Sequence, residues 1–322
     1  MDRRPGPRGR GGVHRSRARA HRAPRAGDPE ARSDRSERPG ELGDDLARVP
    51  QEAPAARPGG RRALRGLGEG RDIAASGLLA GRVALVTGAS RGLGAAIARE
   101  YAAAGASGAV ADLEEGGAPD GWDALVADVR VEEEVAAAVR STVERFGRLD
   151  VVVANAGIVP PWSDTEELDL ERLDEVFAVN VRGVAATLKH AVSALRERGG
   201  SIVVMASLNA WRAHRSQPVY TASKHAVLGL LRSAALDAGR HGIRVNGLAP
   251  GPIATDALRT RLERRAAAGG LAVEKALAEA AAGTALGRMA TEEDVARAAL
   301  FLASDLSSGI TGALLPVDGG IA

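Results

Sequence analysis

Two residues whose types and spacing could move a proton are Tyr220 and Lys224, in the segment YTASK. A separation of four residues places both on one face of a helix. A free tyrosine has a pKa of about 10 and is a poor base at neutral pH, but a nearby cation favours the tyrosinate and lowers that pKa. The pair predicts a general acid/base that exchanges the hydroxyl proton while a hydride moves to or from the carbinol carbon.

The Y-x-x-x-K pattern is weak alone, because a packed tyrosine and a surface lysine produce it by chance. The chain has only two tyrosines and three lysines, however. Ser207 lies 13 residues before Tyr220, and Asn180 lies in a Val-Asn-Val segment further upstream. A serine hydroxyl that donates to the substrate oxygen would stabilise the negative charge that develops there.

A glycine-rich segment, TGASRGLG at 87–94, follows an apolar run and precedes an alanine-rich one. Between a strand and a helix, such glycines permit a tight turn and close approach to a pyrophosphate, which helix N–H groups stabilise. The second apolar run ends at Asp112, where a carboxylate would bind the adenosine ribose and repel the 2′-phosphate of NADP. Arg91 favours NADP instead, but Asp112 would lie directly at the ribose. We therefore expect NAD, with NADP less favoured.

Short apolar runs alternate with amphipathic stretches from about Ile73 onward, which is typical of βαβ units. The sequence predicts an α/β, doubly wound Rossmann fold with a single seven-stranded parallel sheet and helices on both faces. The stretch from Asp112 to Asp128 is short, so the helix there is expected to be reduced to a loop. The expected strands are Val83 to Thr87, Ala109 to Asp112, Ala124 to Ala127, Val151 to Asn155, Ser201 to Met205, Ile243 to Leu248 and Ala313 to Pro316. The expected helices are Ala95 to Ala104, Glu132 to Phe146, Leu173 to Arg198, Thr221 to Arg240 and Glu292 to Ser304, the last capped by Thr291.

Taken together, the G-x-x-x-G-x-G spacing, the Asn-Ala-Gly segment at 155–157 and the ordered Asn, Ser, Tyr and Lys resemble the short-chain dehydrogenase/reductase family over about residues 78–322. The resemblance implies four catalytic residues: Asn180, Ser207, Tyr220 and Lys224. Tyr220 would be the general acid/base, Lys224 would bind the nicotinamide ribose, and Asn180 would hold a water that leads to solvent. Implied cofactor contacts are Gly88, Ser90, Arg91, Leu93, Gly94, Asp112, Asp128, Val129, Asn155, Ala156, Gly157, Ile158, Tyr220, Lys224, Pro250, Gly251, Ile253 and Thr255. Three of these residues have a structural alternative: Asn155 as a support of the sheet, Thr255 as the cap of the next helix, and Asp112 as a solvated loop residue.

Substrate specificity is expected from the loop after Asn155, the segment from Ser207 to Tyr220 and a lid from Thr255 to about Leu286. Trp162 and Trp211 are candidate pocket walls and His214 a candidate polar contact, although each could be simple packing or a solvated residue. The paired arginines of the lid, Arg264 and Arg265, give no substrate signature. Three interpretations stay open. The first is an NAD-dependent secondary-alcohol dehydrogenase acting on a small polyol, hydroxy acid or steroid-like alcohol. The others are an NADPH-dependent 3-oxoacyl-thioester reductase acting on acyl carrier protein, and a catalytically idle binding protein.

Residues 1–72 differ from the rest of the chain, with 18 Arg, 11 acidic residues, 8 prolines and no apolar periodicity. Their net charge is +7, against −5 for the remainder. We expect a disordered tail, or an extension from an upstream start codon, and a catalytic domain at 73–322; the interspersed acids and missing aromatics argue against nucleic-acid binding.

Cysteine is absent, which excludes disulfides and thiolate chemistry, and no metal site is predicted. No apolar run is long enough to cross a membrane. The chain is expected to be a soluble cytoplasmic enzyme acting on a small molecule. The resemblance also implies a homotetramer that packs through the helices Leu173 to Arg198 and Thr221 to Arg240, with a dimer as the alternative.

Overall fold

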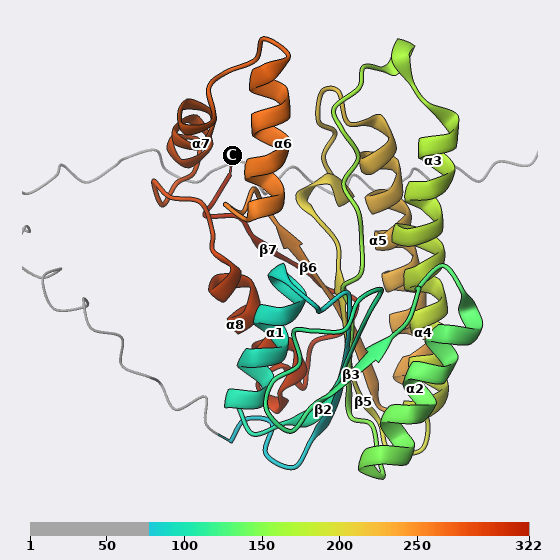
Figure 1. The fold of residues 1–322 in the computed structure, drawn as a ribbon. Coiled ribbons are helices and arrows are strands. Elements are labelled where there is room, and N and C mark those ends of the chain that lie inside the picture. The colour runs from blue at the N-terminus through green and yellow to red at the C-terminus, as the bar shows by residue number, and fades with distance from the viewer. Residues whose placement is uncertain (1–76, 322) are drawn as a thin grey trace, which may run out of the picture. The chain divides into compact units, whose positions relative to one another are not determined.

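The computed structural model describes residues 77–321 (Figure 1). The tail predicted for residues 1–72 lies outside the described residues. The described part begins with a turn at 77–81 that leads directly into the first strand.

The centre of the fold is one parallel sheet of seven strands in the order β3-β2-β1-β4-β5-β6-β7. The order reverses direction beside β1, and this switch point is where doubly wound folds bind dinucleotides. The predicted Rossmann fold is therefore confirmed. The strands are β1 (Val83–Thr87), β2 (Ser107–Asp112), β3 (Asp123–Val126), β4 (Val151–Ala154), β5 (Gly200–Met205), β6 (Ile243–Pro250) and β7 (Leu314–Val317).

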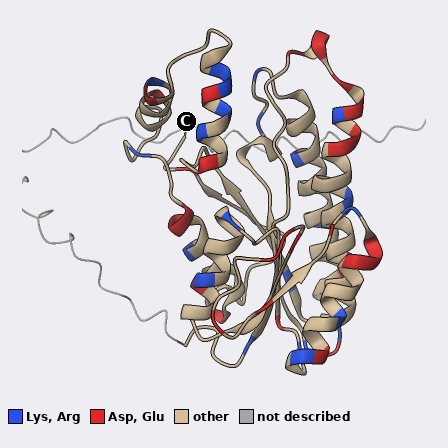
Figure 2. Ribbon diagram, in the orientation of Figure 1, with Lys and Arg blue, Asp and Glu red and all other residues tan. Residues whose placement is uncertain are grey.

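Helices cover both faces of the sheet (Figure 1). On one face, α1 (Gly92–Ala103) and α8 (Glu292–Ala303) bury apolar residues against the strands. On the other face lie α2 (Glu132–Phe146), α4 (Gly183–Leu195) and α5 (Pro218–Gly239). Figure 2 shows the positions of charged residues along the ribbon, mainly on the outer helices and loops and rarely on the central strands. The strands need apolar residues on both sides, because each side is covered.

One predicted helix differs from the structure. The expected continuous helix from Leu173 to Arg198 is divided into α3 (Leu170–Phe177), a π-helical turn η2 (Ala178–Arg182) and α4. A π turn inserts one residue into the helical repeat, and such turns often lie at functional sites. Asn180 lies inside this turn.

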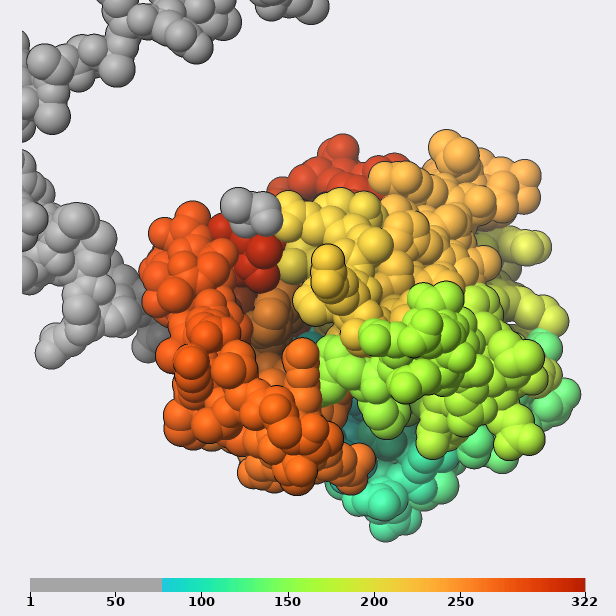
Figure 3. All heavy atoms as spheres, turned by 90° about the horizontal axis from the view of Figure 1, so that it is seen from above, coloured from blue at the N-terminus to red at the C-terminus, as the bar shows by residue number. Residues whose placement is uncertain are grey.

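Two helices had no predicted bounds, α6 (Asp256–Ala267) and α7 (Val273–Ala282), although a helix after Thr255 was one of the open interpretations. Both belong to the segment expected to form a lid, and Figure 1 shows them beyond the carboxyl ends of β6 and β7. Seen from above, they face the segments that follow β4 and β5 across a hollow (Figure 3). The connection between β2 and β3 has no helix, as the short spacing predicted.

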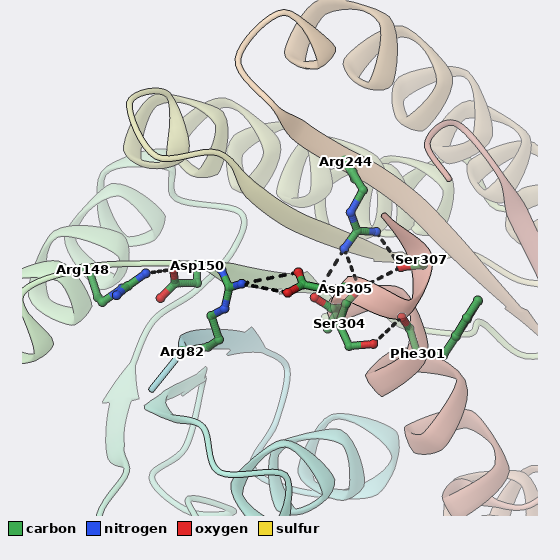
Figure 4. Close-up of polar contacts among 9 residues, drawn as sticks. Arg82, Arg148, Asp150, Arg244, Phe301, Ser304, Asp305 and Ser307 are labelled. Carbon is green, nitrogen blue, oxygen red and sulfur yellow. Dashed lines mark hydrogen bonds and ion pairs between the residues drawn. The ribbon is translucent and has the colours of Figure 1, made fainter. Parts of the chain in front are cut away.

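The amino ends of the strands are held by a separate polar network (Figure 4). Buried Asp150 accepts a hydrogen bond from the Val83 amide and pairs with Arg148. Arg244 donates to the carbonyl oxygens of Leu302 and Ser304 beyond α8. A cavity of about 490 Å³ lies at this edge. It is at the end of the sheet opposite the predicted chemistry, so we assign this network to the fold.

Candidate active site

The glycine-rich loop packs closely against the end of β4. Gly88 has a φ of +65°, and a Cβ there would lie 2.5 Å from the Cα of Ala156. A Cβ at Gly94 would lie 2.2 Å from the carbonyl oxygen of Gly88. Only glycine fits at either position, and the loop consequently delivers the chain tightly into α1.

The N-terminus of α1 is open to an anion. Arg91 precedes the helix and its side chain caps no amide, and the first turn contains no acidic residue. Unpaired N–H groups at a helix start attract phosphate through their partial positive charge. The loop and helix start therefore fit the pyrophosphate of a nicotinamide dinucleotide.

Asp112 lies beside this loop at the end of β2. Its Oδ2 accepts hydrogen bonds from the amide (2.9 Å) and the hydroxyl (2.8 Å) of Ser90, and its Oδ1 accepts from the Leu113 amide (2.7 Å). These bonds orient the carboxylate toward the glycine-rich loop. Asp112 is thus tied to the candidate cofactor site and is not a free loop residue.

Asn155 joins β4 to β1. Its Nδ2 donates to the carbonyl oxygens of Thr87 (3.0 Å) and Gly88 (2.7 Å). This side chain therefore supports the glycine-rich loop, which is the structural role that the sequence left open.

Asp128 and Val129 follow β3, which ends at Val126. Asp128 pairs with Arg130, and this hydrogen-bonded cation holds the pKa of the carboxyl below its usual range. Val129 is buried against Gly183 at the start of α4. Both follow β3, which is the neighbour of β2 in the sheet, and β2 ends at Asp112.

Lys224 is buried in α5 with 3% of its surface exposed. Its Nζ donates to the carbonyl oxygen of Met205 at the end of β5 (2.9 Å) and lies 5.7 Å from the centre of the Tyr220 ring. Burial lowers the pKa of Lys224 to about 8. The predicted shared helix face is thus observed, and the ammonium lies beneath the phenol ring.

Tyr220 lies near Ser207 and the lid. Burial raises the pKa of its hydroxyl, while a hydrogen bond with Ser207 and the positive charge of Arg261 act in the opposite direction. The sequence predicted a lowered pKa with Lys224 as the cause. The structure differs, because desolvation of the phenol outweighs the neighbouring groups and the ammonium of Lys224 points to a carbonyl oxygen.

Asn180 is fully buried, and its side chain connects the η2 turn to the segment after β4 and to α5. Its Oδ1 accepts from the amide of Ile158 (2.8 Å), and its Nδ2 donates to the carbonyl oxygen of Ile158 (2.9 Å) and to the hydroxyl of Ser223 (3.2 Å). Ser223 directly precedes Lys224 in the helix. Asn180 thereby connects the segment after β4 to α5, the helix that carries Tyr220 and Lys224.

The turn after β6 brings the lid to this site. Gly251 donates to the carbonyl oxygen of Val317, and a Cβ there would lie 2.9 Å from the Asp318 side chain. Ile253 is buried and pairs with Ala290. Thr255 accepts a hydrogen bond from the Leu258 amide, so its side chain caps α6, as the structural interpretation expected.

The candidate substrate residues divide into two groups. Trp211 is 39% exposed and His214 is exposed, with its ring bonded only locally to Arg215, so neither forms an enclosed wall. Trp162 is partly buried, and the guanidinium carbon of Arg261 lies 4.2 Å from its ring centre. Sequence reasoning missed Arg261, because nothing local distinguishes it from the other arginines of α6.

Within residues 77–321, no group of histidine, aspartate and glutamate side chains is arranged to hold a metal ion. No helix in that part of the chain has both the length and the apolar character needed to span a bilayer.

Comparison with known proteins agrees with this geometry. A family model described as enoyl-(acyl carrier protein) reductase matches residues 88–322. Short-chain dehydrogenase reductase 3a of Arabidopsis thaliana is 41% identical over 256 residues, which cover 76% of this chain and 97% of that protein. Levodione reductase has a TM-score of 0.71 and 35% identity, covering 75% of this chain and 97% of its own. Carveol dehydrogenase from Mycobacterium avium in complex with NAD has a TM-score of 0.70 and 31% identity, covering 76% and 99%. The chain belongs to the short-chain dehydrogenase/reductase family, whose members are oxidoreductases acting on CH–OH groups.

Proposed function

We propose that this protein interconverts a secondary alcohol and a ketone with NAD(H), using Tyr220 as the general acid/base. The observation that carries the proposal is the grouping of Tyr220, Ser207 and Lys224. Ser207 acts on the phenol closely enough to counteract the rise in its pKa, and the buried ammonium of Lys224 lies 5.7 Å from the phenol ring. A phenol in this setting can exchange the proton of a substrate hydroxyl held beside Ser207.

Each residue has a distinct task in this scheme. When bound, the nicotinamide cofactor supplies or accepts the hydride at the carbinol carbon. Ser207 donates to the substrate oxygen and stabilises its developing negative charge, and Tyr220 gives a proton in reduction or removes one in oxidation. Lys224 would bind the nicotinamide ribose.

Asn180 has a positioning task in this scheme. It orients the catalytic helix through the hydroxyl of Ser223. It would also keep a water near Lys224 that returns the proton to solvent.

Asp112 supports the choice of NAD. Its carboxylate is fixed at the glycine-rich loop by Ser90 and Leu113. A fixed negative charge there would repel a 2′-phosphate while accepting ribose hydroxyls. The carveol dehydrogenase structure, which holds NAD, is consistent with this choice.

A second candidate is an NADPH-dependent reductase of 3-oxoacyl thioesters on acyl carrier protein. Two observations favour it: Arg91 is exposed beside the glycine-rich loop, and the description of the matching family names an acyl-carrier-protein substrate. An exposed guanidinium is a suitable partner for a 2′-phosphate.

The two candidates are separated by titrating NADH and NADPH fluorescence, with wild type, Asp112→Ala and Arg91→Ala. The NAD proposal expects tighter NADH binding, and it expects Asp112→Ala to weaken NADH by about 10-fold, since a charged hydrogen bond contributes about 1.5 to 3 kcal/mol. Tighter NADPH binding that Arg91→Ala removes would overturn it in favour of the thioester reductase. Repeating the titration on residues 73–322 tests whether the tail contributes.

We also propose a cytoplasmic homotetramer that packs through the helical segment 173–198, which comprises most of α3, the η2 turn and α4, and through α5. The exposed apolar side chain of Leu236 on α5, 85% accessible, supports an interface on that helix. Light scattering during size-exclusion chromatography should return four chains, and a monomer would contradict this assembly.

A further inference from the structure

The lid and the loop after β4 meet through two side chains, Arg261 and Trp162. The guanidinium carbon of Arg261 lies 4.2 Å from the centre of the Trp162 ring, and that of Arg265 lies 5.1 Å from it. At 4.2 Å the guanidinium is in contact with the aromatic ring, and this interaction orients it. The contact joins two segments that the sequence assigned to substrate specificity.

Three nitrogens of this pair are buried without a hydrogen-bond partner: Nε and Nη2 of Arg261 and Nε1 of Trp162. Within residues 77–321, the one other buried side-chain nitrogen without a hydrogen-bond partner is Nε of Arg148. It lies beside Asp150 at the amino ends of the strands (Figure 4). An unpaired buried donor is costly, more so when it is charged. Three such donors in one contact indicate a site that binds an acceptor.

The pair is held beside the general acid. The amide of Ser163 donates to the carbonyl oxygen of Ser216 (2.9 Å), and the hydroxyl of Ser216 donates to Asp164. These bonds fasten the Trp162 loop to the segment that leads into Tyr220. The charge of Arg261 also reaches the hydroxyl of Tyr220, since it counteracts the effect of burial on the pKa of that phenol.

The unpaired atoms select the chemistry of the ligand. Nε and Nη2 form one edge of the guanidinium, and two parallel N–H groups on that edge match the two oxygens of a carboxylate. The indole N–H of Trp162 adds a third donor. An arginine stays charged under these conditions, so a neutral partner would leave its charge uncompensated.

We propose that Arg261 and Trp162 form a carboxylate subsite, and that the substrate is a small hydroxy acid or oxo acid whose reacting carbon lies at Tyr220. This inference rests on the proposed function, since it names the substrate class of the same site. The carboxylate would pair with the guanidinium edge while Ser207 and Tyr220 hold the reacting oxygen. The substrate is thereby held at both ends.

The test compares short-chain hydroxy acids with their methyl esters, which keep the carbinol and lose the charge, in the presence of NAD. Wild type should favour the acid by about 30-fold or more in kcat/KM, mainly through KM. Arg261→Gln should remove the preference, and Arg261→Lys should keep part of it. Arg264→Gln, an exposed arginine on the same helix, is the matched control and should change nothing.

Two results overturn the inference: equal kcat/KM for acid and ester in wild type, or an equal loss for both in Arg261→Gln. Weakened NADH binding in Arg261→Gln would also overturn it, because the arginine would then hold the cofactor.

A binding measurement separates this inference from the proposed function. Butyrate and butyramide are titrated against the NADH complex of Tyr220→Phe by tryptophan fluorescence. Binding of butyrate but not of butyramide, lost in Arg261→Gln, supports the subsite even if no alcohol is oxidised. Absent binding, with wild type still oxidising alcohols, contradicts the subsite and leaves the proposed function intact.

Discussion

The side-chain amide of Asn180 pairs with both backbone groups of Ile158, accepting from its N–H at 2.8 Å and donating to its carbonyl oxygen at 2.9 Å. The side-chain amide thus makes the same two hydrogen bonds that the backbone of a neighbouring strand would make. It fixes the segment after β4 against the π turn and, through Ser223, against the helix that carries Tyr220 and Lys224.

Replacing Asn180 should therefore affect stability and catalysis together. Asn180→Ala leaves the N–H and carbonyl of Ile158 without partners, and we expect a loss of about 2 to 4 kcal/mol in the free energy of unfolding. Asn180→Asp keeps the acceptor and loses both donated bonds, so its kcat should fall as well. Urea denaturation with steady-state kinetics measures both effects. Unchanged stability in the alanine variant would contradict the positioning role.

Gly94 should be intolerant of any side chain. Gly94→Ala places a methyl group 2.2 Å from the Gly88 carbonyl oxygen, and the loop must then shift away from the pyrophosphate position. We expect NADH binding to weaken by at least about 10-fold, measured by fluorescence titration. Gly239→Ala is the control: it has no atom within 4 Å of the new methyl group and should bind NADH normally. Normal NADH binding by Gly94→Ala would count against the assigned cofactor loop.

Lys224 should give the cofactor-free protein a specific pH dependence of stability. Its pKa is about 8 in the folded protein and 10.5 ordinarily, so between these values the unfolded chain binds the extra proton. Stability should therefore rise with pH from about 8 to 10, by up to about 1.4 kcal/mol per pH unit. Burial raises the pKa of both tyrosines, so above pH 10 they lose their protons in the unfolded chain first. Their effect lowers the free energy of unfolding only above that pH.

Urea denaturation at several pH values measures this slope. Lys224→Met removes the titrating group and should flatten the curve between pH 8 and 10. A slope that persists in Lys224→Met would assign it to another group.

The hydroxyl of Thr291 should stabilise the fold only by capping α8. Its hydroxyl accepts from the Asp294 amide, and Asp294 accepts from the Thr291 amide, which completes a capping box. Thr291→Ala should lower the free energy of unfolding by about 1 kcal/mol, while Thr291→Ser should restore most of it. Thermal unfolding compares the two variants, and equal losses would show that the hydroxyl does not cap the helix.

The strands could be predicted because their signals are local, and the four-residue spacing likewise predicted that Tyr220 and Lys224 share one helix face. Buried parallel strands are continuous apolar runs, and β1 was predicted with the observed bounds. Thr291 followed by three acidic residues likewise predicted the start of α8.

The π turn at Asn180 could not be predicted, since no Gly or Pro interrupts the segment from Leu173 to Arg182, and the partner of Asn180, Ile158, is distant in the sequence. The extent of α6 could not be predicted because the helix buries little apolar surface, with Leu262 its one buried residue. Arg261 is distinguished only by its contact with Trp162, which lies about a hundred positions earlier in the chain. The pKa of Tyr220 depends on burial, which spacing alone does not reveal.

The most direct test of the account uses the two tyrosines of the chain. Tyr220→Phe removes the phenol beside Ser207, whereas Tyr101→Phe removes a buried hydroxyl that donates to the carbonyl oxygen of Ala299 far from the site. With NAD and an alcohol that wild type oxidises, we predict that Tyr220→Phe lowers kcat by about 10²- to 10⁴-fold and leaves NADH affinity intact. Tyr101→Phe should keep its kcat and lose only about 1 kcal/mol of stability. Retention of substantial turnover by Tyr220→Phe would contradict its role as the general acid/base.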